Sequence, residues 1–203
     1  MSTTTVNIDA KLVKELRDKT GAPFGDCKNA LVEANGDIEQ AVIVLRKKGV
    51  ATAGKKASRT TNEGSVASYI HAGGKIGVLL ELNCESDFVA RTDDFRALAK
   101  DLCLHIASAR PMAVSKEQVP ADVVEREKRI FEAQAVEEKK PEAMREKIIQ
   151  GRLKKFFEET VLLEQKFIKD DKVTVGDLVK ALAGKTGENV QVRRFARFEL
   201  GAD

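Results

Sequence analysis

Few side chains in this sequence could make or break bonds in a substrate. The histidines are His71 and His105, and the cysteines are Cys27, Cys84 and Cys103, which stand far apart and form no CxxC pair. A thiol enzyme would use Cys84 as its nucleophile, with a histidine as the base. Cysteines more often serve as small apolar core residues, and that interpretation is favoured for Cys84.

Other motifs that carry chemistry are absent from the sequence. It contains no P-loop, no dinucleotide-binding GxGxxG, no HExxH zinc pair and no GxSxG nucleophile elbow. The adjacent acids Asp93 and Asp94 follow Thr92, which can cap a helix, and carboxylates are favoured in a first helical turn. We therefore expect a protein that works by binding and not as an enzyme, without a cofactor or a metal ion.

One aromatic residue stands where a turn is expected. In the stretch ELNCESDFVAR, residues 81–91, Phe88 follows Asp87 and lies two residues after Ser86, between an apolar strand and a helix. A core is already supplied by its neighbours Ile76, Val78, Leu80, Leu82, Phe95, Leu98 and Leu102. Most aromatic residues are core residues, but a turn is a poor place to bury another ring and aromatic residues are enriched at the hot spots of protein interfaces. From the residues alone, both a core role and a role as an apolar probe for a partner stay open for Phe88.

Composition limits the class of protein further. The chain has 203 residues, of which 42% are hydrophobic and 33% charged, and its net charge is +3. A charge this small does not indicate a dedicated nucleic-acid binder. Three well-separated cysteines fit a reducing compartment, and no apolar run has the length of a signal peptide or a membrane helix. We expect a cytoplasmic protein that binds neither membranes nor nucleic acid directly.

The first 63 residues predict a small helical domain and a linker. Residues 1–49 show three short apolar stripes of helical period, with an aspartate N-cap before the first and the third. The second helix is expected over residues 26–36, and Gly49 is expected to end the third. Each helix is too short to be stable alone, so the three must pack together. Residues 50–63 are small and basic and predict a linker with room for some helix.

Residues 64–203 predict a core of antiparallel strands packed with helices. SVASYIHA and KIGVLLEL flank Gly73-Gly74 and alternate as a hairpin does. The later segments predict helices starting near Asp93, Pro120 and Pro141, a strand over residues 161–168, a turn, a helix capped by Thr174, and a last strand over residues 188–200. His105 falls at the edge of its helix stripe, so we expect it to be partly exposed. Helices and strands in separate blocks indicate an α+β fold.

Two segments resemble the signatures of one family. ELNCESDFVAR closely resembles the second signature of bacterial elongation factor Ts, and LRDKTGAPFGDCKNAL, residues 16–31, resembles the first. The resemblance continues in the family's order through GSVASYIH, EKIIQGRLKKFFEETVLLEQKF and ENVQVRRFARFELG, and so covers essentially the whole chain. The chain departs from the family at Ser86, where threonine is usual, and at Phe24-Gly25, where many members carry two bulky apolar residues. It resembles short members that lack the duplicated half of the core and the long coiled-coil insertion, and that tend to act as dimers.

The resemblance implies a translation elongation factor that promotes nucleotide exchange on the GTPase elongation factor Tu. The three-helix domain, similar to ubiquitin-associated domains, would dock on the nucleotide-binding domain of the GTPase. Phe88 would insert between helices of the GTPase, and Asp87 and Phe88 together would disturb the groups that hold Mg²⁺ and the phosphates. The positions that match family contacts are Leu16, Arg17, Thr20, Phe24, Lys28, Asp87, Phe88, Val89 and His105, and residues 64–203 would form the dimerisation core. Leu16 also fits the helix stripe, so a core role stays open for it.

Three other classes of function remain to be distinguished. A ubiquitin-associated-like adaptor would bind its partner without affecting nucleotide exchange. A translation protein that binds RNA through the linker lysines and VRRFAR would lose affinity steeply with salt. A thiol enzyme would be sensitive to alkylation.

Overall fold

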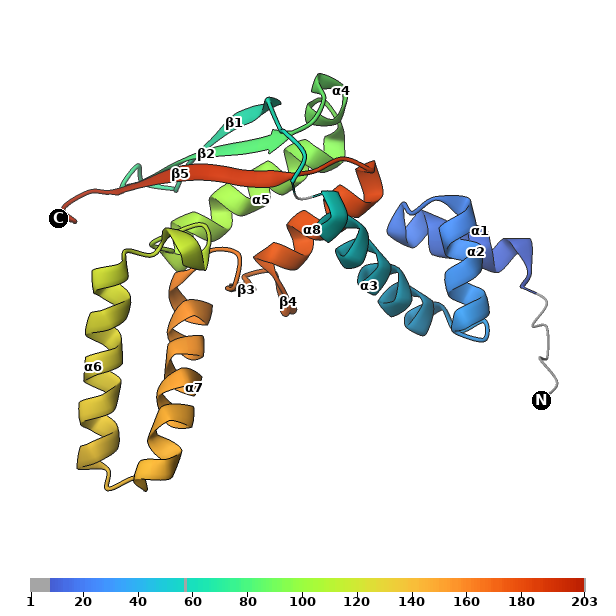
Figure 1. Cartoon of the computed structure of the whole chain (residues 1–203). Coiled ribbons are helices and arrows are strands. Elements are labelled where there is room, and N and C mark those ends of the chain that lie inside the picture. The colour runs from blue at the N-terminus through green and yellow to red at the C-terminus, as the bar shows by residue number, and fades with distance from the viewer. Residues whose placement is uncertain (1–7, 57, 203) are drawn as a thin grey trace. The chain divides into compact units, whose positions relative to one another are not determined.

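The computed structural model of the chain describes residues 8–56 and 58–202. Residues 1–7 of the N-terminal stretch and Ala57 of the predicted linker lie outside this description, as does Asp203. The helices and strands confirm the predicted α+β fold (Figure 1). They form two compact units, each assembled from segments far apart in the sequence. The first unit holds the described residues up to Gly64, Asn83–Phe95 and Val179–Gln191, and the second holds the rest.

Three helices open the first unit, as predicted. They are α1 (Ala10–Thr20), α2 (Phe24–Glu33) and α3 (Ile38–Lys56). The Asp9 side chain accepts a hydrogen bond from the Lys11 backbone N–H at 3.0 Å, and Asp37 accepts one from that of Gln40 at 3.0 Å. These carboxylates satisfy backbone donors that a helix start leaves unpaired. The core between the helices consists of Val13, Leu16, Cys27, Ala30, Leu31 and Ala41.

Three boundaries in this part differ from the prediction, one of them the end of α2, which lies at Glu33 and not at residue 36. Helix α2 begins at Phe24 and not at residue 26, because Pro23 stands at its N-cap, a place where a missing N–H costs nothing. Helix α3 runs past Gly49 to Lys56. A Cβ on Gly184 would lie 3.0 Å from the Gly49 Cα, so α8 (Val175–Thr186) passes close to α3 here, whereas a Cβ on Gly49 itself would meet no atom within 4 Å. The helix continues through Gly49.

A three-stranded sheet of order β1-β2-β5 carries most of the strand structure. Strands β1 (Glu63–Ile70) and β2 (Ile76–Cys84) form the predicted hairpin around Gly73-Gly74, and β5 (Gln191–Glu199) lies on the other side of β2. Val78, Leu80 and Leu82 alternate along β2 and are buried on one face. Helix α5 (Asp93–Ala109) covers this inner face (Figure 1), and the Arg197 guanidinium of β5 bonds to the Ala107 carbonyl at 3.1 Å.

A helical hairpin extends the second unit. After the short 3₁₀ turn η1 (Lys116–Gln118), helices α6 (Ala121–Glu137) and α7 (Glu142–Thr160) run side by side (Figure 1). The Arg152 guanidinium donates to the Gln134 side chain at 2.9 Å and to the Glu138 carboxylate at 2.7 Å, which ties the two helices together near their connection. Both helices start after a proline, as predicted.

The predicted strand over residues 161–168 is wrong for most of its length. Only Lys166–Phe167 form a strand, β3, which pairs antiparallel with β4 (Asp170–Thr174). Of the turn predicted over residues 169–171, Lys169 lies in a turn, and Asp170 and Asp171 belong to β4. The backbone N–H groups of Leu162 and Leu163 bond to the carbonyls of Ala113 and Val114 at 2.9 and 3.1 Å. This apolar run is therefore buried as a loop against another loop, an environment that periodicity does not distinguish from a strand. Helix α8 (Val175–Thr186) follows, with the predicted Thr174 cap.

Within the ranges 8–56 and 58–202, no helix combines the length and the apolar character needed to cross a membrane.

Candidate partner-binding site

The turn that carries Phe88 is a single helical turn held between two regular elements. Strand β2 ends at Cys84, and α4 (Asp87–Ala90) follows before α5 begins. The Ser86 hydroxyl caps α4 by accepting from the Val89 N–H at 3.4 Å. The Thr92 hydroxyl donates to the Val89 carbonyl at 2.8 Å and accepts from the Phe95 N–H at 3.3 Å, and so caps α5 as predicted. Both ends of the turn are thereby tied down.

Phe88 points out of this turn into solvent. Its side chain is 84% exposed, whereas the next residue, Val89, is buried. Exposing a benzyl group costs hydrophobic free energy, so such a residue marks a binding surface more readily than a fold requirement. Asp87 is also exposed, and its carboxylate pairs with the Arg91 guanidinium at 2.8 Å one turn later. Of the three predicted contact residues in this turn, Asp87 and Phe88 are exposed, whereas Val89 is buried and anchors the turn to the core.

The neighbouring thiol is not poised for nucleophilic chemistry. Burial raises the pKa of the Cys84 thiol to about 11, with the Glu188 carboxylate adding to the effect. The thiol donates a hydrogen bond to the Ser86 carbonyl at 3.1 Å. A cysteine nucleophile needs a lowered pKa, so the structure favours the core interpretation of Cys84. Among the described residues, no group of three or more acids, histidines and cysteines is arranged to hold a metal ion.

A second set of predicted contacts lies on the three-helix part. Arg17 and Lys28 are exposed on α1 and α2, and Phe24 is 51% exposed at the first position of α2. Thr20 is half-buried, and its hydroxyl donates to the Leu16 carbonyl at 2.7 Å and accepts from the Ala22 N–H at 3.3 Å. Thr20 thus closes the end of α1 and shapes the turn to α2.

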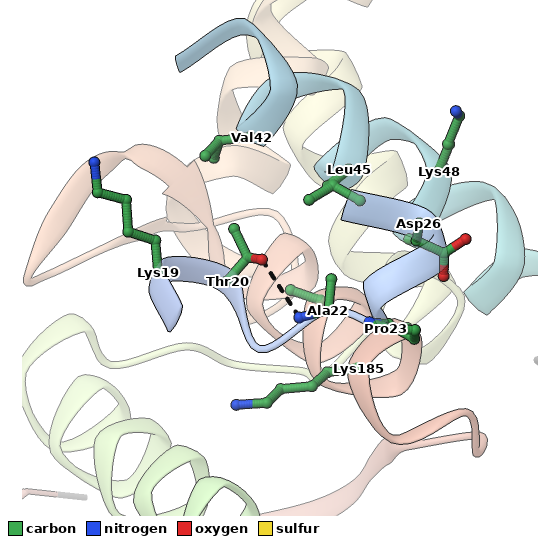
Figure 2. Close-up of a pocket in the computed structure, with 12 residues that line it drawn as sticks. Lys19, Thr20, Ala22, Pro23, Asp26, Val42, Leu45, Lys48 and Lys185 are labelled. Atoms are coloured by element: carbon green, nitrogen blue, oxygen red, sulfur yellow. Dashed lines mark hydrogen bonds between the residues drawn. The ribbon is translucent and has the colours of Figure 1, made fainter. Parts of the chain in front are cut away.

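A cavity of about 530 Å³ adjoins this turn within the first unit. Thr20 and Ala22 line it from the turn, and Val42 and Leu45 line it from α3 (Figure 2). Lysine ammonium groups are at its edge, but each of them is paired with a nearby acid: Lys19 with Glu15, Lys48 with Glu33, and Lys185 with Asp94.

Leu16 does not offer a side chain to a partner. It has no exposed surface and packs in the three-helix core. Of the two roles left open by the sequence, the structure supports the core role, because the apolar stripe of α1 turns Leu16 inward with Val13. Leu16 is therefore excluded from the surface proposed below.

The predicted partial exposure of His105 is also wrong. The side chain is fully buried, and its Nε2 lies 2.9 Å from the Gln165 side-chain oxygen. The Ile168 backbone N–H donates to Nδ1 at 3.4 Å, which assigns the proton of a neutral ring to Nε2. Burial lowers the pKa of His105. In this conformation the ring holds the loop of residues 161–168 and reaches no partner.

Glu188 is a residue that pattern reasoning did not single out. It lies between α8 and β5, and its carboxylate accepts hydrogen bonds from the Ser86 backbone and side chain across 102 positions of sequence. Its place beside the second signature depends on tertiary contacts, so no local spacing could have revealed it.

Comparison with known proteins places the chain in a family. The family model described as "Elongation factor TS" matches residues 10–202. The chain belongs to the elongation factor Ts family. It is similar to the elongation factor Ts of Koribacter versatilis, with 58% identity over 196 residues that cover 97% of this chain and 90% of that protein. The elongation factor Ts of Caldanaerobacter subterraneus is 57% identical over 96% of this chain and 97% of its own length, and that of Fervidobacterium nodosum is 55% identical over 97% and 100%.

Proposed function

We propose that this translation elongation factor promotes release of GDP from elongation factor Tu and stabilises the nucleotide-free GTPase until GTP binds. Membership in the elongation factor Ts family supports this role. The single observation that carries the proposal is the exposure of Phe88, which leaves the ring free to enter a partner. Asp87 beside it supplies a carboxylate that can compete for groups around the magnesium site.

The mechanism follows from thermodynamic linkage. If the factor binds nucleotide-free GTPase more tightly than GDP-bound GTPase, it must weaken GDP binding by the same ratio. Shifting the population from 1:99 to 99:1 takes about 5.5 kcal/mol of differential affinity. Burial of one aromatic ring together with a few desolvated contacts that form only in the nucleotide-free state is of that order. The factor itself forms no bond and needs no cofactor for this reaction.

The three-helix part would supply affinity and orientation. Arg17, Phe24 and Lys28 are exposed there and can dock on the nucleotide-binding domain of the GTPase. A Cβ at Gly25 would meet no atom within 4 Å, so the bulky residue that many family members carry there would face outward. Its loss in this chain reduces the apolar surface offered beside Phe24.

The deciding experiment is stopped-flow release of a fluorescent GDP analogue from a bacterial elongation factor Tu. We expect this chain to accelerate release strongly at micromolar concentration. Tight binding of the chain without acceleration would support the adaptor alternative and refute exchange.

The arginines of VRRFAR do not favour the RNA-binding alternative, because most of them bond to groups within the chain. The Arg194 guanidinium pairs with the Glu81 carboxylate at 2.7 Å. Arg197 bonds to the Ala107 carbonyl and to Glu199. Two of the three positive charges in this segment are therefore engaged within the chain.

We further propose that the chain acts as a homodimer through the outer face of its sheet. Val66 and Phe198 are 71% and 66% exposed, and Ile70 and Leu79 are exposed as well. Alternation along the strands places these four side chains opposite the buried face. Exposed apolar side chains that share one sheet face can mark a protein interface, and such a face can pair with its own copy about a two-fold axis.

Sedimentation velocity tests the dimer. A Phe198→Glu substitution should shift the wild-type dimer to a monomer with an unchanged circular dichroism spectrum. A wild-type chain that sediments as a monomer at tens of micromolar would refute this part of the proposal without affecting the exchange activity.

A further inference from the structure

The segment between α8 and β5 holds the start of the Phe88 turn through one carboxylate. Glu188 Oε2 accepts from the backbone N–H groups of Glu85 and Ser86 at 3.1 and 3.0 Å, and Oε1 accepts from the Ser86 hydroxyl at 2.6 Å. The same hydroxyl accepts from the Val89 N–H. Two hydrogen bonds in series therefore connect Glu188 to the residue that follows Phe88.

The connection is reciprocal. The Glu85 carboxylate accepts from the Asn189 backbone N–H at 2.6 Å, so each segment presents an acid to the backbone of the other. The Arg59 guanidinium also reaches Glu85 Oε1 at 3.5 Å. The hydrogen bonds of Glu85 and Glu188 therefore join two segments that lie about a hundred positions apart in the sequence.

Local structure alone would not hold this turn. Helix α4 has four residues, and an isolated helix of that length is not stable in water. The N–H groups of Glu85 and Ser86 come just after β2 ends, where the ladder no longer supplies acceptors. Hydrogen bonds from backbone N–H groups to a carboxylate are shorter and stronger than those between neutral groups. The carboxylate of Glu188 thus supplies the acceptor for three donors at the start of this turn.

We propose that Glu188 is a positioning residue for nucleotide exchange, which holds the Ser86–Ala90 turn so that Phe88 is presented to the GTPase in a fixed orientation. This inference rests on the proposed exchange function. Preorganisation lowers the entropy that must be lost when the ring inserts. Glu188 itself touches neither nucleotide nor magnesium and acts through Phe88.

The test measures GDP release from elongation factor Tu with two variants at Glu188. Glu188→Gln keeps the shape and one acceptor but loses the charge, and we expect about a threefold slower release. Glu188→Ala leaves three donors without their acceptor, and we expect about a tenfold slower release. The matched control is Glu199→Gln. Like Glu188, Glu199 is a carboxylate with several partners, in its case the guanidinium groups of Arg110 and Arg197, but it lies on β5, away from the Phe88 turn in sequence. Its release rate should equal the wild-type rate.

A double-mutant cycle separates positioning from general destabilisation. If Glu188 acts through the ring, Glu188→Gln should slow release in the wild-type background and change it by less than about 1.5-fold in a Phe88→Ala background, since the two residues share one effect. Equal slowing in both backgrounds would refute the positioning role. Full activity of Glu188→Gln and Glu188→Ala in chains that melt as wild type would refute it as well.

The outcomes also distinguish this inference from the function on which it rests. If the wild-type chain does not accelerate release, the exchange proposal fails. If the wild-type chain accelerates release and both Glu188 variants match it, exchange stands and only the positioning role fails.

Discussion

Removing the Phe88 ring should separate exchange activity from folding. With 84% of the side chain exposed, and an aromatic side chain offering roughly 200 Å² in total, about 170 Å² is available for burial in a partner. At about 25 cal/mol per Å² this surface contributes about 4 kcal/mol on insertion. Ordering the ring costs about 1 kcal/mol, which leaves about 3 kcal/mol. Phe88→Ala should therefore slow GDP release by about 100-fold at a fixed factor concentration.

The same geometry predicts little effect on folding. The buried remainder of the side chain is roughly 30 Å², so truncation should lower the free energy of unfolding by less than about 1 kcal/mol. Stopped-flow release of a fluorescent GDP analogue and urea unfolding measure the two quantities on the same samples. Met112→Ala is a suitable control, because Met112 is 49% exposed and lies outside the proposed contact surface. Near-wild-type exchange by folded Phe88→Ala would refute the insertion argument.

Four further changes test other parts of the description. Arg17→Ala should weaken the complex with elongation factor Tu by about fivefold in calorimetry, because it removes an exposed interface charge, and its melting temperature should not change. The control Lys11→Ala, on another face of α1, should leave the affinity unchanged. Unfolding of the Arg17 variant would show that Arg17 has a structural role. Because burial lowers the pKa of His105 in the folded chain, the unfolded chain binds its proton first, so the free energy of unfolding should fall as pH drops below about 6.5. The His105→Gln variant should lose that slope in urea titrations from pH 7.5 to 5, and an unaltered slope would contradict the assignment. Cys84, with a pKa of about 11, should react with iodoacetamide at pH 8 about 100-fold more slowly than in the denatured chain, and rapid native alkylation would revive the thiol-enzyme alternative. Gly25→Ala should raise the free energy of unfolding by up to about 1 kcal/mol, since the position is helical and a Cβ meets no atom there; a destabilised variant in urea titrations would contradict this.

Local signals in the sequence predicted the local structure well. The caps at Asp9, Asp37, Thr92 and Thr174 are confirmed by hydrogen bonds from backbone N–H groups two or three residues ahead. The hairpin around Gly73-Gly74 follows from alternation and turn chemistry in the same way. These features depend on interactions within a few residues, so the order of side chains is sufficient to anticipate them.

Errors arose where a residue's role depends on a distant partner. Gly49 was predicted as a helix end, but it lies where Gly184 approaches α3 closely. The run of residues 161–168 was predicted as a strand, but its backbone bonds to the loop of residues 113–114. In both cases the local pattern fits two environments equally well, and only the packing partner selects one of them.

The same distinction between local and long-range features applies to the candidate site. Residue types and their order were enough to place an aspartate and a phenylalanine between a strand and a helix, and the two signatures indicated the elongation factor Ts family. The packed chain was needed to learn that Phe88 faces solvent, that Leu16 and His105 are buried, and that the Glu188 carboxylate bonds to the Ser86 N–H 102 positions away. The physical reason is that exposure and long-range hydrogen bonds are properties of the packed chain, which residue types and spacing constrain but do not specify.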